Sequence, residues 1–136
     1  MMIFIKLYIV ALPILLVLDA LWIGLVAKDV FKQHVGHLMA QEMRWGAAGS
    51  FYLVYILGLV FFVIAPAIRE NSWIQALLCG AFFGFIAYAT YDLTNLATLD
   101  KWPATLAFFD MLWGSFVSGA VALITYWIGK IVFRIG

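Results

Sequence analysis

The feature that most constrains this chain is the length of its apolar stretches. Hydrophobic residues make up 67% of the chain and charged residues 11%, whereas a soluble domain of this size needs far more polar surface. The stretches are longer than the ~20 residues that a helix needs to cross a bilayer, and they lack the alternation of barrel strands. We therefore predict an all-α membrane protein, one domain with four transmembrane helices in an antiparallel bundle. The predicted spans are residues 3–27, 46–68, 73–99 and 103–133.

The connection between the first two spans has a pattern of its own. From about residue 29 to residue 44, apolar side chains recur every three or four positions, and polar or charged side chains lie between them. This pattern is typical of an amphipathic helix that lies in the membrane interface. We predict an interfacial helix over residues 29–44, which ends at Arg44.

Three aspartates interrupt the apolar spans: Asp19 in the first, Asp92 in the third and Asp110 in the fourth. Spans one and three run towards the same side and span four runs away from it, so each acid lies roughly 10–13 Å inside that side. Ionisable side chains within a span usually face the bundle interior and mark a functional site. We expect the three carboxyl groups to converge in one layer. In an apolar interior they need a proton or a positive partner such as Arg44.

Aromatic and polar neighbours complete a candidate ligand site around these acids. The motif Asp-x-Leu-Trp occurs at Asp19 and again at Asp110, and residues three apart share a helix face, so each carboxyl group could lie beside an indole N–H. The alternative is structural: these side chains bond the acids only to fix helix register, and Thr94 bonds back to the carbonyl of Thr90. The predicted ligand-binding residues are Asp19, Trp22, Arg44, Tyr88, Tyr91, Asp92, Thr94, Asn95, Asp110 and Trp113.

Small residues recur every four positions in the last two spans. Such residues let two helix backbones approach closely, so spans three and four are expected to pack along them. They also offer faces through which a larger complex, or copies of the chain, could associate. The two stripes are Ala76, Gly80 and Gly84 in the third span, and Gly114, Ser118 and Ala122 in the fourth.

Several function classes find no support in the sequence. The net charge of +1 gives no basic footprint for nucleic acid. A single cysteine allows no disulfide within the chain, and no cofactor motif, phosphate-binding loop or nucleophile elbow occurs. His34 and His37 are three residues apart and could offer two imidazoles to a metal, but surface histidines on an interfacial helix are the commoner case. We therefore predict no metal and no cofactor.

Four sequence stretches carry a resemblance to a known family. The chain resembles small bacterial predicted membrane proteins catalogued as a domain of unknown function, and the resemblance covers essentially its whole length. It implies a four-span protein of the bacterial inner membrane and supplies no catalytic residue. The stretches are LDALWIG at residues 18–24, YDLTNLAT at 91–98, Trp102-Pro103, and DMLWG at 110–114.

The leading hypothesis is a small-molecule or lipid binding or transport-type protein with an intramembrane carboxylate cluster. One alternative is an integral-membrane enzyme of lipid or isoprenoid modification, in which one acid donates a proton and another accepts it. The other is a structural subunit of a larger membrane complex. An even number of spans places both termini on one side. Positive charges are evenly divided between the two sides, and the short N-terminal tail favours the cytoplasm.

Overall fold

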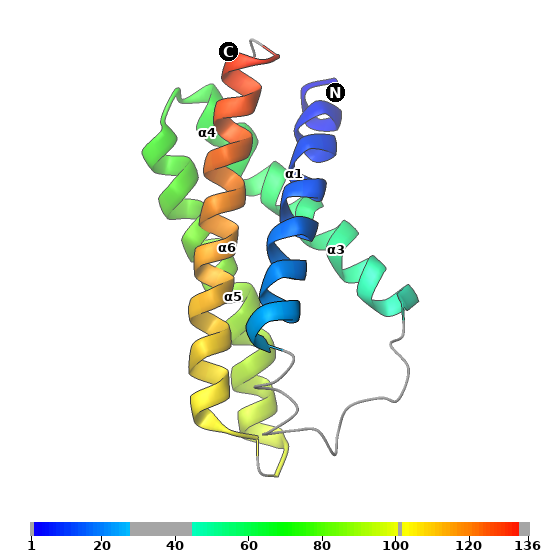
Figure 1. Ribbon diagram of the computed structural model, residues 1–136. Coiled ribbons are helices and arrows are strands. Elements are labelled where there is room, and N and C mark those ends of the chain that lie inside the picture. The colour runs from blue at the N-terminus through cyan, green and yellow to red at the C-terminus, as the bar shows by residue number, and fades with distance from the viewer. Residues whose placement is uncertain (1, 28–44, 101, 134–136) are drawn as a thin grey trace.

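The computed structural model describes residues 2–27, 45–100 and 102–133, and every regular element in these ranges is helical (Figure 1). Helix α1 ends in a π-helical turn, and a second π-helical turn joins α3 to α4. The predicted interfacial helix at residues 29–44 lies outside the described residues. The elements are α1 (Met2–Trp22), a π turn (Ile23–Ala27), α3 (Trp45–Leu59), a π turn (Val60–Ile64), α4 (Ala65–Arg69), α5 (Trp73–Thr98) and α6 (Ala104–Ile131).

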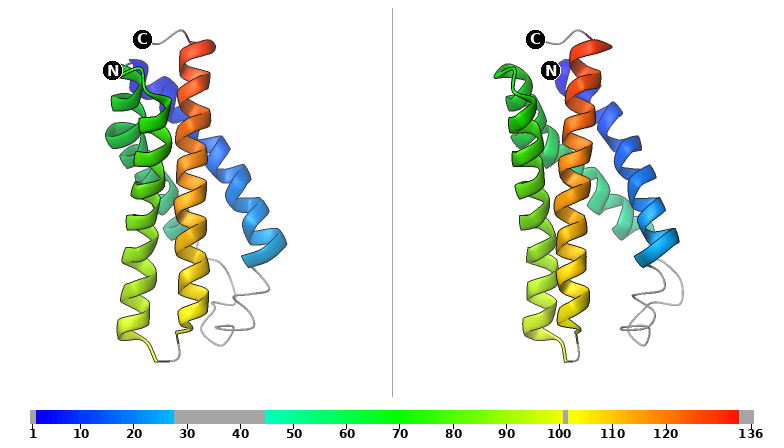
Figure 2. Two further views of the ribbon diagram at one scale, coloured as in Figure 1. Left: turned by 90° about the vertical axis from the view of Figure 1, so that its left-hand side faces the viewer. Right: turned by 60° about the vertical axis from the view of Figure 1, so that its left-hand side comes forward.

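Within the described residues, four helices are long and apolar enough to cross a membrane. The start of α1 and the end of α6 lie at the same end of the bundle (Figures 1 and 2). Large apolar side chains such as Leu25, Phe62 and Ile131 are exposed, as lipid-facing positions require. These findings confirm the predicted all-α membrane fold. The four spans are Met2–Leu25, Gly46–Arg69, Trp73–Thr98 and Ala104–Ile131.

The second span changes its helical geometry in front of Pro66. Proline has no N–H, and in a regular helix its ring would clash with the carbonyl group of Phe62, four residues earlier. Here the backbone widens into the π turn Val60–Ile64, and Pro66 then lies in the first turn of α4. Pro13, by contrast, lies within the regular helix α1. A π turn of this kind is a usual way for a helix to absorb a local irregularity.

Helices α5 and α6 form the most extensive helix pair of the bundle, and they meet along the predicted small-residue stripes. A Cβ atom added at Gly80 would lie 2.7 Å from the Ala122 Cβ, and one added at Gly84 would overlap the Gly114 carbonyl oxygen and the Ser118 side chain. The two backbones are therefore closer than larger residues would permit. Ser115 adds a hydrogen bond across this seam, donating to the carbonyl oxygen of Ala81 at 3.0 Å.

The turn between α4 and α5 is closed by a hydrogen-bonded cap. Asn71 has a φ of 52°, the left-handed conformation that commonly ends a helix. The backbone N–H of Ser72 donates to the Ala67 carbonyl oxygen at 3.0 Å, and the Ser72 hydroxyl accepts from the Gln75 N–H at 3.1 Å. Lys130 of α6 donates to the side-chain oxygen of Asn71, which joins this turn to the last helix.

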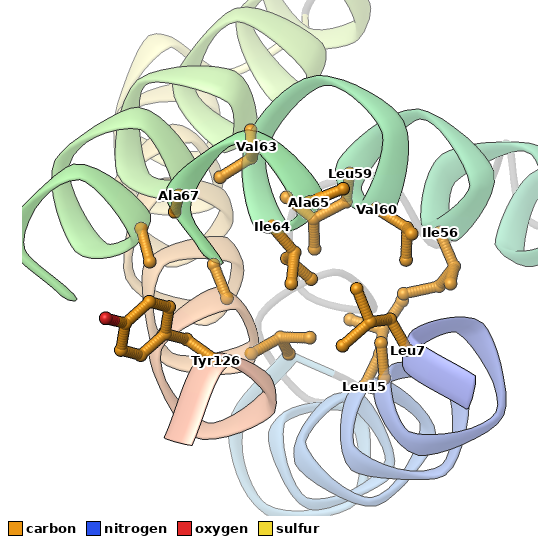
Figure 3. Packing of buried hydrophobic residues seen from close by; sticks show 14 of the residues in the cluster. Leu7, Leu15, Ile56, Leu59, Val60, Val63, Ile64, Ala65, Ala67 and Tyr126 are labelled. Atoms are coloured by element: carbon orange, nitrogen blue, oxygen red, sulfur yellow. The ribbon is translucent and has the colours of Figure 1, made fainter. Parts of the chain in front are cut away.

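An apolar core fills the half of the bundle that is nearer the termini. Buried side chains from α1, the second span and α6 meet there, and Figure 3 shows part of this packing around Leu7, Ile64 and Tyr126. Leu15 and Ile56 also belong to this core. The three buried aspartates lie beyond it, towards the hairpin between α5 and α6.

Candidate functional site

The three aspartates of the spans are buried at one level of the bundle. The exposed fractions of their side chains are 8% for Asp19, 0% for Asp92 and 7% for Asp110. Asp19 precedes the end of its span at Leu25 by six residues, Asp92 precedes Thr98 by six, and Asp110 follows Ala104 by six. Each is therefore about 9 Å inside the same end of the bundle. All three are buried, and we call the three residues the acid layer.

Asp19 is held by donors from two other helices. The Tyr52 hydroxyl of α3 donates to Oδ2 of Asp19, and the Trp113 indole Nε1–H of α6 donates to its Oδ1 at 3.3 Å. One carboxylate thus links α1 to both the second and the fourth span. Bonds between neutral donors and a charged acceptor are among the stronger ones in proteins, so Asp19 has a clear structural role.

The two Asp-x-Leu-Trp motifs meet through their tryptophans. The rings of Trp22 and Trp113 stack with centroids 4.6 Å apart and planes 7° apart. Trp113 bonds to Asp19 of the first motif rather than to Asp110 of its own. An indole N–H does donate to a carboxyl group, as expected, but the two groups belong to different helices. The reason is geometric: the Trp113 ring extends sideways towards α1, where Trp22 and Asp19 both contact it.

Asp92 and Asp110 form a pair across the seam between α5 and α6. Their carboxyl groups lie next to each other. Neither oxygen of Asp92 has a hydrogen-bond donor among the described residues. Two carboxyl groups can bond to each other only when one of them carries a proton, because an ionised carboxylate is an acceptor alone. This pair therefore differs from Asp19, whose two oxygens both have donors.

Two tyrosines extend the polar region between Asp19 and the pair. The Tyr88 ring lies directly against Gly114, where a Cβ atom would overlap it. The Tyr55 ring meets it edge-on, with centroids 6.4 Å apart. Tyr55 is only 5% exposed, and its hydroxyl group has no hydrogen-bond partner in the described part of the chain. Both tyrosines are close enough to Asp19 to interact with its charge.

The remaining predicted site residues lie farther out. Tyr91 is 51% exposed and Thr94 is also exposed, while Asn95 is half-buried. Successive helical residues are turned by about 100°, so Tyr91 and Thr94 cannot share the inward face of Asp92. Tyr91 instead packs edge-on against the buried ring of Trp102, with centroids 5.9 Å apart. Arg44, the predicted counter-charge, lies outside the described residues.

The structural alternative for Thr94 is a hydrogen bond from its hydroxyl group to a carbonyl oxygen of its own helix. Two other threonines of α5, Thr90 and Thr98, make a bond of this kind. Thr90 donates to the Ile86 carbonyl oxygen and Thr98 to that of Thr94, both at 2.7 Å.

Sequence reasoning missed the contribution of the second span, Tyr52 and Tyr55. A signal for them exists in the sequence: the two tyrosines are three residues apart, so they share a helix face. Tyr52 lies six residues inside the start of the span at Gly46, as far as each acid lies inside its own span, and Tyr55 lies about one turn deeper. A phenolic hydroxyl near that depth is thus a signal of the layer in addition to the carboxyl groups.

The described residues contain no group of three His, Cys, Asp or Glu side chains arranged to hold a metal ion. The acid layer thus consists of the Asp92–Asp110 pair and of Asp19, which is bonded separately to Tyr52 and Trp113. His34 and His37 lie outside the described residues.

Comparison with known proteins places the chain among membrane proteins. The family model described as "Predicted membrane protein (DUF2177)" matches residues 4–127, which is most of the chain. The chain belongs to this family. The DUF2177 description names a membrane protein and no activity, in agreement with the four apolar spans. Neither a curated protein nor a solved structure matches the chain.

Proposed function

We propose that this DUF2177 protein is a binding or transport-type protein of the bacterial inner membrane, and that it holds a small-molecule or lipid ligand at the acid layer. The observation that carries the proposal is Asp92, which is fully buried while both of its oxygens lack a donor within the described residues. Placing an ionisable side chain inside a span costs ~2.5 kcal/mol or more.

Asp19 provides the contrast that makes Asp92 informative. A carboxylate that only fixes helix register should have its oxygens bonded to neighbouring helices, and Asp19 does, through Tyr52 and Trp113. Asp92 lies at the same level beside Asp110 and has no such donor in the described ranges. Buried polar groups without partners occur where a ligand, a proton or water completes the site. We assign the ligand to the Asp92–Asp110 pair and the structural role to Asp19.

A thermal-shift assay in detergent tests this function. Purified protein is screened against a panel of lipids and polar metabolites, and ligands that raise the unfolding temperature are retested on Asp92→Asn. A ligand at a hundredfold excess over its Kd stabilises the folded state by about 2.7 kcal/mol, an effect large enough to measure. Asp100→Asn is the matched control, because it makes the same chemical change at an exposed position. Ligand shifts that are equal in the Asp92→Asn variant and the wild type would remove Asp92 from any ligand role.

The unequal surroundings of the carboxyl groups favour a second candidate, an integral-membrane enzyme that modifies a lipid or isoprenoid. Asp19 accepts two hydrogen bonds, whereas Asp92 accepts none from the described residues. Acid–base chemistry needs carboxyl groups with such different environments. Deletion of the gene should then remove one modified lipid from the membrane, and expression of Asp92→Asn should not restore it. An unaltered lipid profile would count against the enzyme.

The membrane orientation is part of the proposal. The start of α1 and the end of α6 lie at one end of the bundle (Figure 1), and we assign that end to the cytoplasm. Fusion of a fluorescent protein and of a periplasmic phosphatase to the C-terminus tests this. The cytoplasmic orientation predicts a fluorescent first fusion and an inactive second one.

A further inference from the structure

We propose that the ligand of the acid layer is a small organic cation, whose protonated amine lies between Asp92 and Asp110 and beside the ring of Tyr88. This inference rests on the proposed ligand-binding function and names the chemical class of the ligand. Three independent features support it: the charge of the site, the supply of hydrogen-bond donors, and the aromatic rings around it.

The charge of the acid layer is the first feature. Asp92 and Asp110 are adjacent carboxyl groups in an apolar interior, where two uncompensated negative charges repel strongly. The lysines and arginines within the described ranges are Lys6, Arg69 and Lys130. They belong to the start of α1, the end of α4 and the end of α6, at the opposite end of the bundle (Figure 1). No described residue therefore brings a positive charge to the pair, and a cationic ligand would supply one.

The supply of donors is the second feature. Asp19 already takes the donors of Tyr52 and Trp113, so these two are not available to Asp92. An ammonium group carries three N–H donors and no acceptor, so it can bond both oxygens of Asp92 and one of Asp110. An alcohol of the same size has a single donor and brings no charge. The amine is therefore the group that best fits this pair.

The aromatic rings are the third feature. Tyr88 lies on Gly114, within reach of the charges of Asp19 and Asp110, and a tyrosine face attracts a cation that has lost its water. The Tyr55 hydroxyl is independent evidence for a ligand, because it is buried and lacks a partner among the described residues while its ring contacts Tyr88.

Proton exchange follows from this arrangement. Without ligand, one proton shared by Asp92 and Asp110 leaves the pair with a single negative charge. When the ammonium group binds, that proton leaves to water and the net charge is unchanged, so amine and proton compete for the pair. Within the described residues, the titratable groups close enough to interact with the pair are Asp19 of α1 and Tyr88 and Tyr91 of α5.

The test compares phenethylamine with phenethyl alcohol, which has nearly the same shape and no charge. Isothermal titration calorimetry on the detergent-purified protein, in two buffers of different ionisation enthalpy, measures affinity and proton release together. The proposal predicts binding of the amine at least tenfold tighter than that of the alcohol, with release of about one proton. Competition with a proton also predicts a Kd that rises about tenfold for each unit by which the pH is lowered.

Variants locate the effect. Asp92→Asn should lose the binding and the proton release, whereas Asp100→Asn should keep both. Tyr55→Phe removes only a hydroxyl group, so it should fold even where Asp92→Asn does not, and it should weaken binding several-fold. Tyr126→Phe is its control, because Tyr126 is also buried but lies sixteen residues beyond Asp110 on α6, about 24 Å along the helix axis.

The possible results separate this inference from the function on which it rests. Equal binding of amine and alcohol, or amine binding without proton release, would overturn the cationic ligand while an Asp92-dependent ligand remained. The same holds if only neutral lipids give Asp92-dependent thermal shifts. If no compound in either assay depends on Asp92, the proposed function fails and the cationic ligand fails with it.

Discussion

The indole rings of Trp22 and Trp113 stack face to face, with centroids 4.6 Å apart and planes 7° apart. They come from α1 and α6, which are the first and last helices of the chain. Beside this stack the Trp113 indole donates to Asp19. The first span is thus fastened to the fourth at the level of the acid layer by one stacked pair and one hydrogen bond.

This stack predicts a spectroscopic signature. Two parallel indoles at this separation couple electronically, so circular dichroism of the purified protein should show a paired positive and negative exciton band. Both Trp22→Phe and Trp113→Phe should abolish it, because each removes one partner. Trp127→Phe is the control, since Trp127 is 42% exposed and packs edge-on against Tyr126. A couplet that survives either substitution in the stack would contradict the geometry.

The Tyr52–Asp19 hydrogen bond predicts an energetic coupling between the second and first spans. Tyr52→Phe leaves one oxygen of a buried carboxylate without its donor, so it should lower the free energy of unfolding by about 1–3 kcal/mol. Asp19→Ala, which removes the acceptor, should lower it as well. The double variant should lose less than the sum of the two, because both remove the same bond. The free energy of unfolding of the wild type and the three variants is measured in mixed micelles at increasing denaturant concentration. If the losses of the two single variants add up to that of the double variant, the bond contributes nothing.

The seam between α5 and α6 predicts a steep size limit at Gly84. A methyl group there would overlap the Gly114 carbonyl oxygen and the Ser118 side chain, so Gly84→Ala should force the helices apart and cost about 1–3 kcal/mol. Gly49→Ala is the matched control. A Cβ at Gly49 meets nothing within 4 Å, and alanine favours a helix over glycine by about 1 kcal/mol. The control should therefore unfold at the same or a higher denaturant concentration than the wild type.

The cap at the start of α5 predicts a local effect at Ser72. Ser72→Ala removes the side-chain acceptor of the Gln75 N–H, which typically costs about 1 kcal/mol. Ser50→Ala is the comparison, because the Ser50 hydroxyl donates to the Gly46 carbonyl oxygen within its own helix at 2.7 Å and caps nothing. Hydrogen exchange should quicken at the first turn of α5 in Ser72→Ala alone. Equal exchange in the two variants would argue against the cap.

The parts of the fold that were predictable from sequence follow from one-dimensional patterns. The length of the apolar stretches predicts the four spans. The repeat of small residues that includes Gly80 and Gly84 predicts the close packing of α5 against α6. The shared depth of Asp19, Asp92 and Asp110 followed from counting residues to the span ends. Each of these depends only on helix geometry and on the apolar environment of the bilayer.

The parts that were not predictable depend on how helices turn about their axes. Counting residues placed Trp113 beside Asp110, but the rotation of α6 directs its indole to Asp19 on another helix. Tyr52 donates to the same carboxylate from α3, a contact that no spacing within one span can reveal. Tyr91 and Thr94 share the depth of the layer and still face outwards, because one or two residues along a helix change the face completely.

The apolar core near the termini and the aspartates beyond it determine from which side of the membrane a solute could reach the bundle interior. Leu7, Leu15, Ile56 and Ile64 fill the half that is nearer the termini, while each aspartate lies fewer than two helical turns from the opposite end of its span. A solute at Asp92 is thus in contact with a single leaflet, and a hydrophobic plug separates it from the far side. Under the proposed binding function, the molecule would therefore take its ligand from one side only. To move cargo across, α1 and the second span would have to swing away from α6 and unseal that plug.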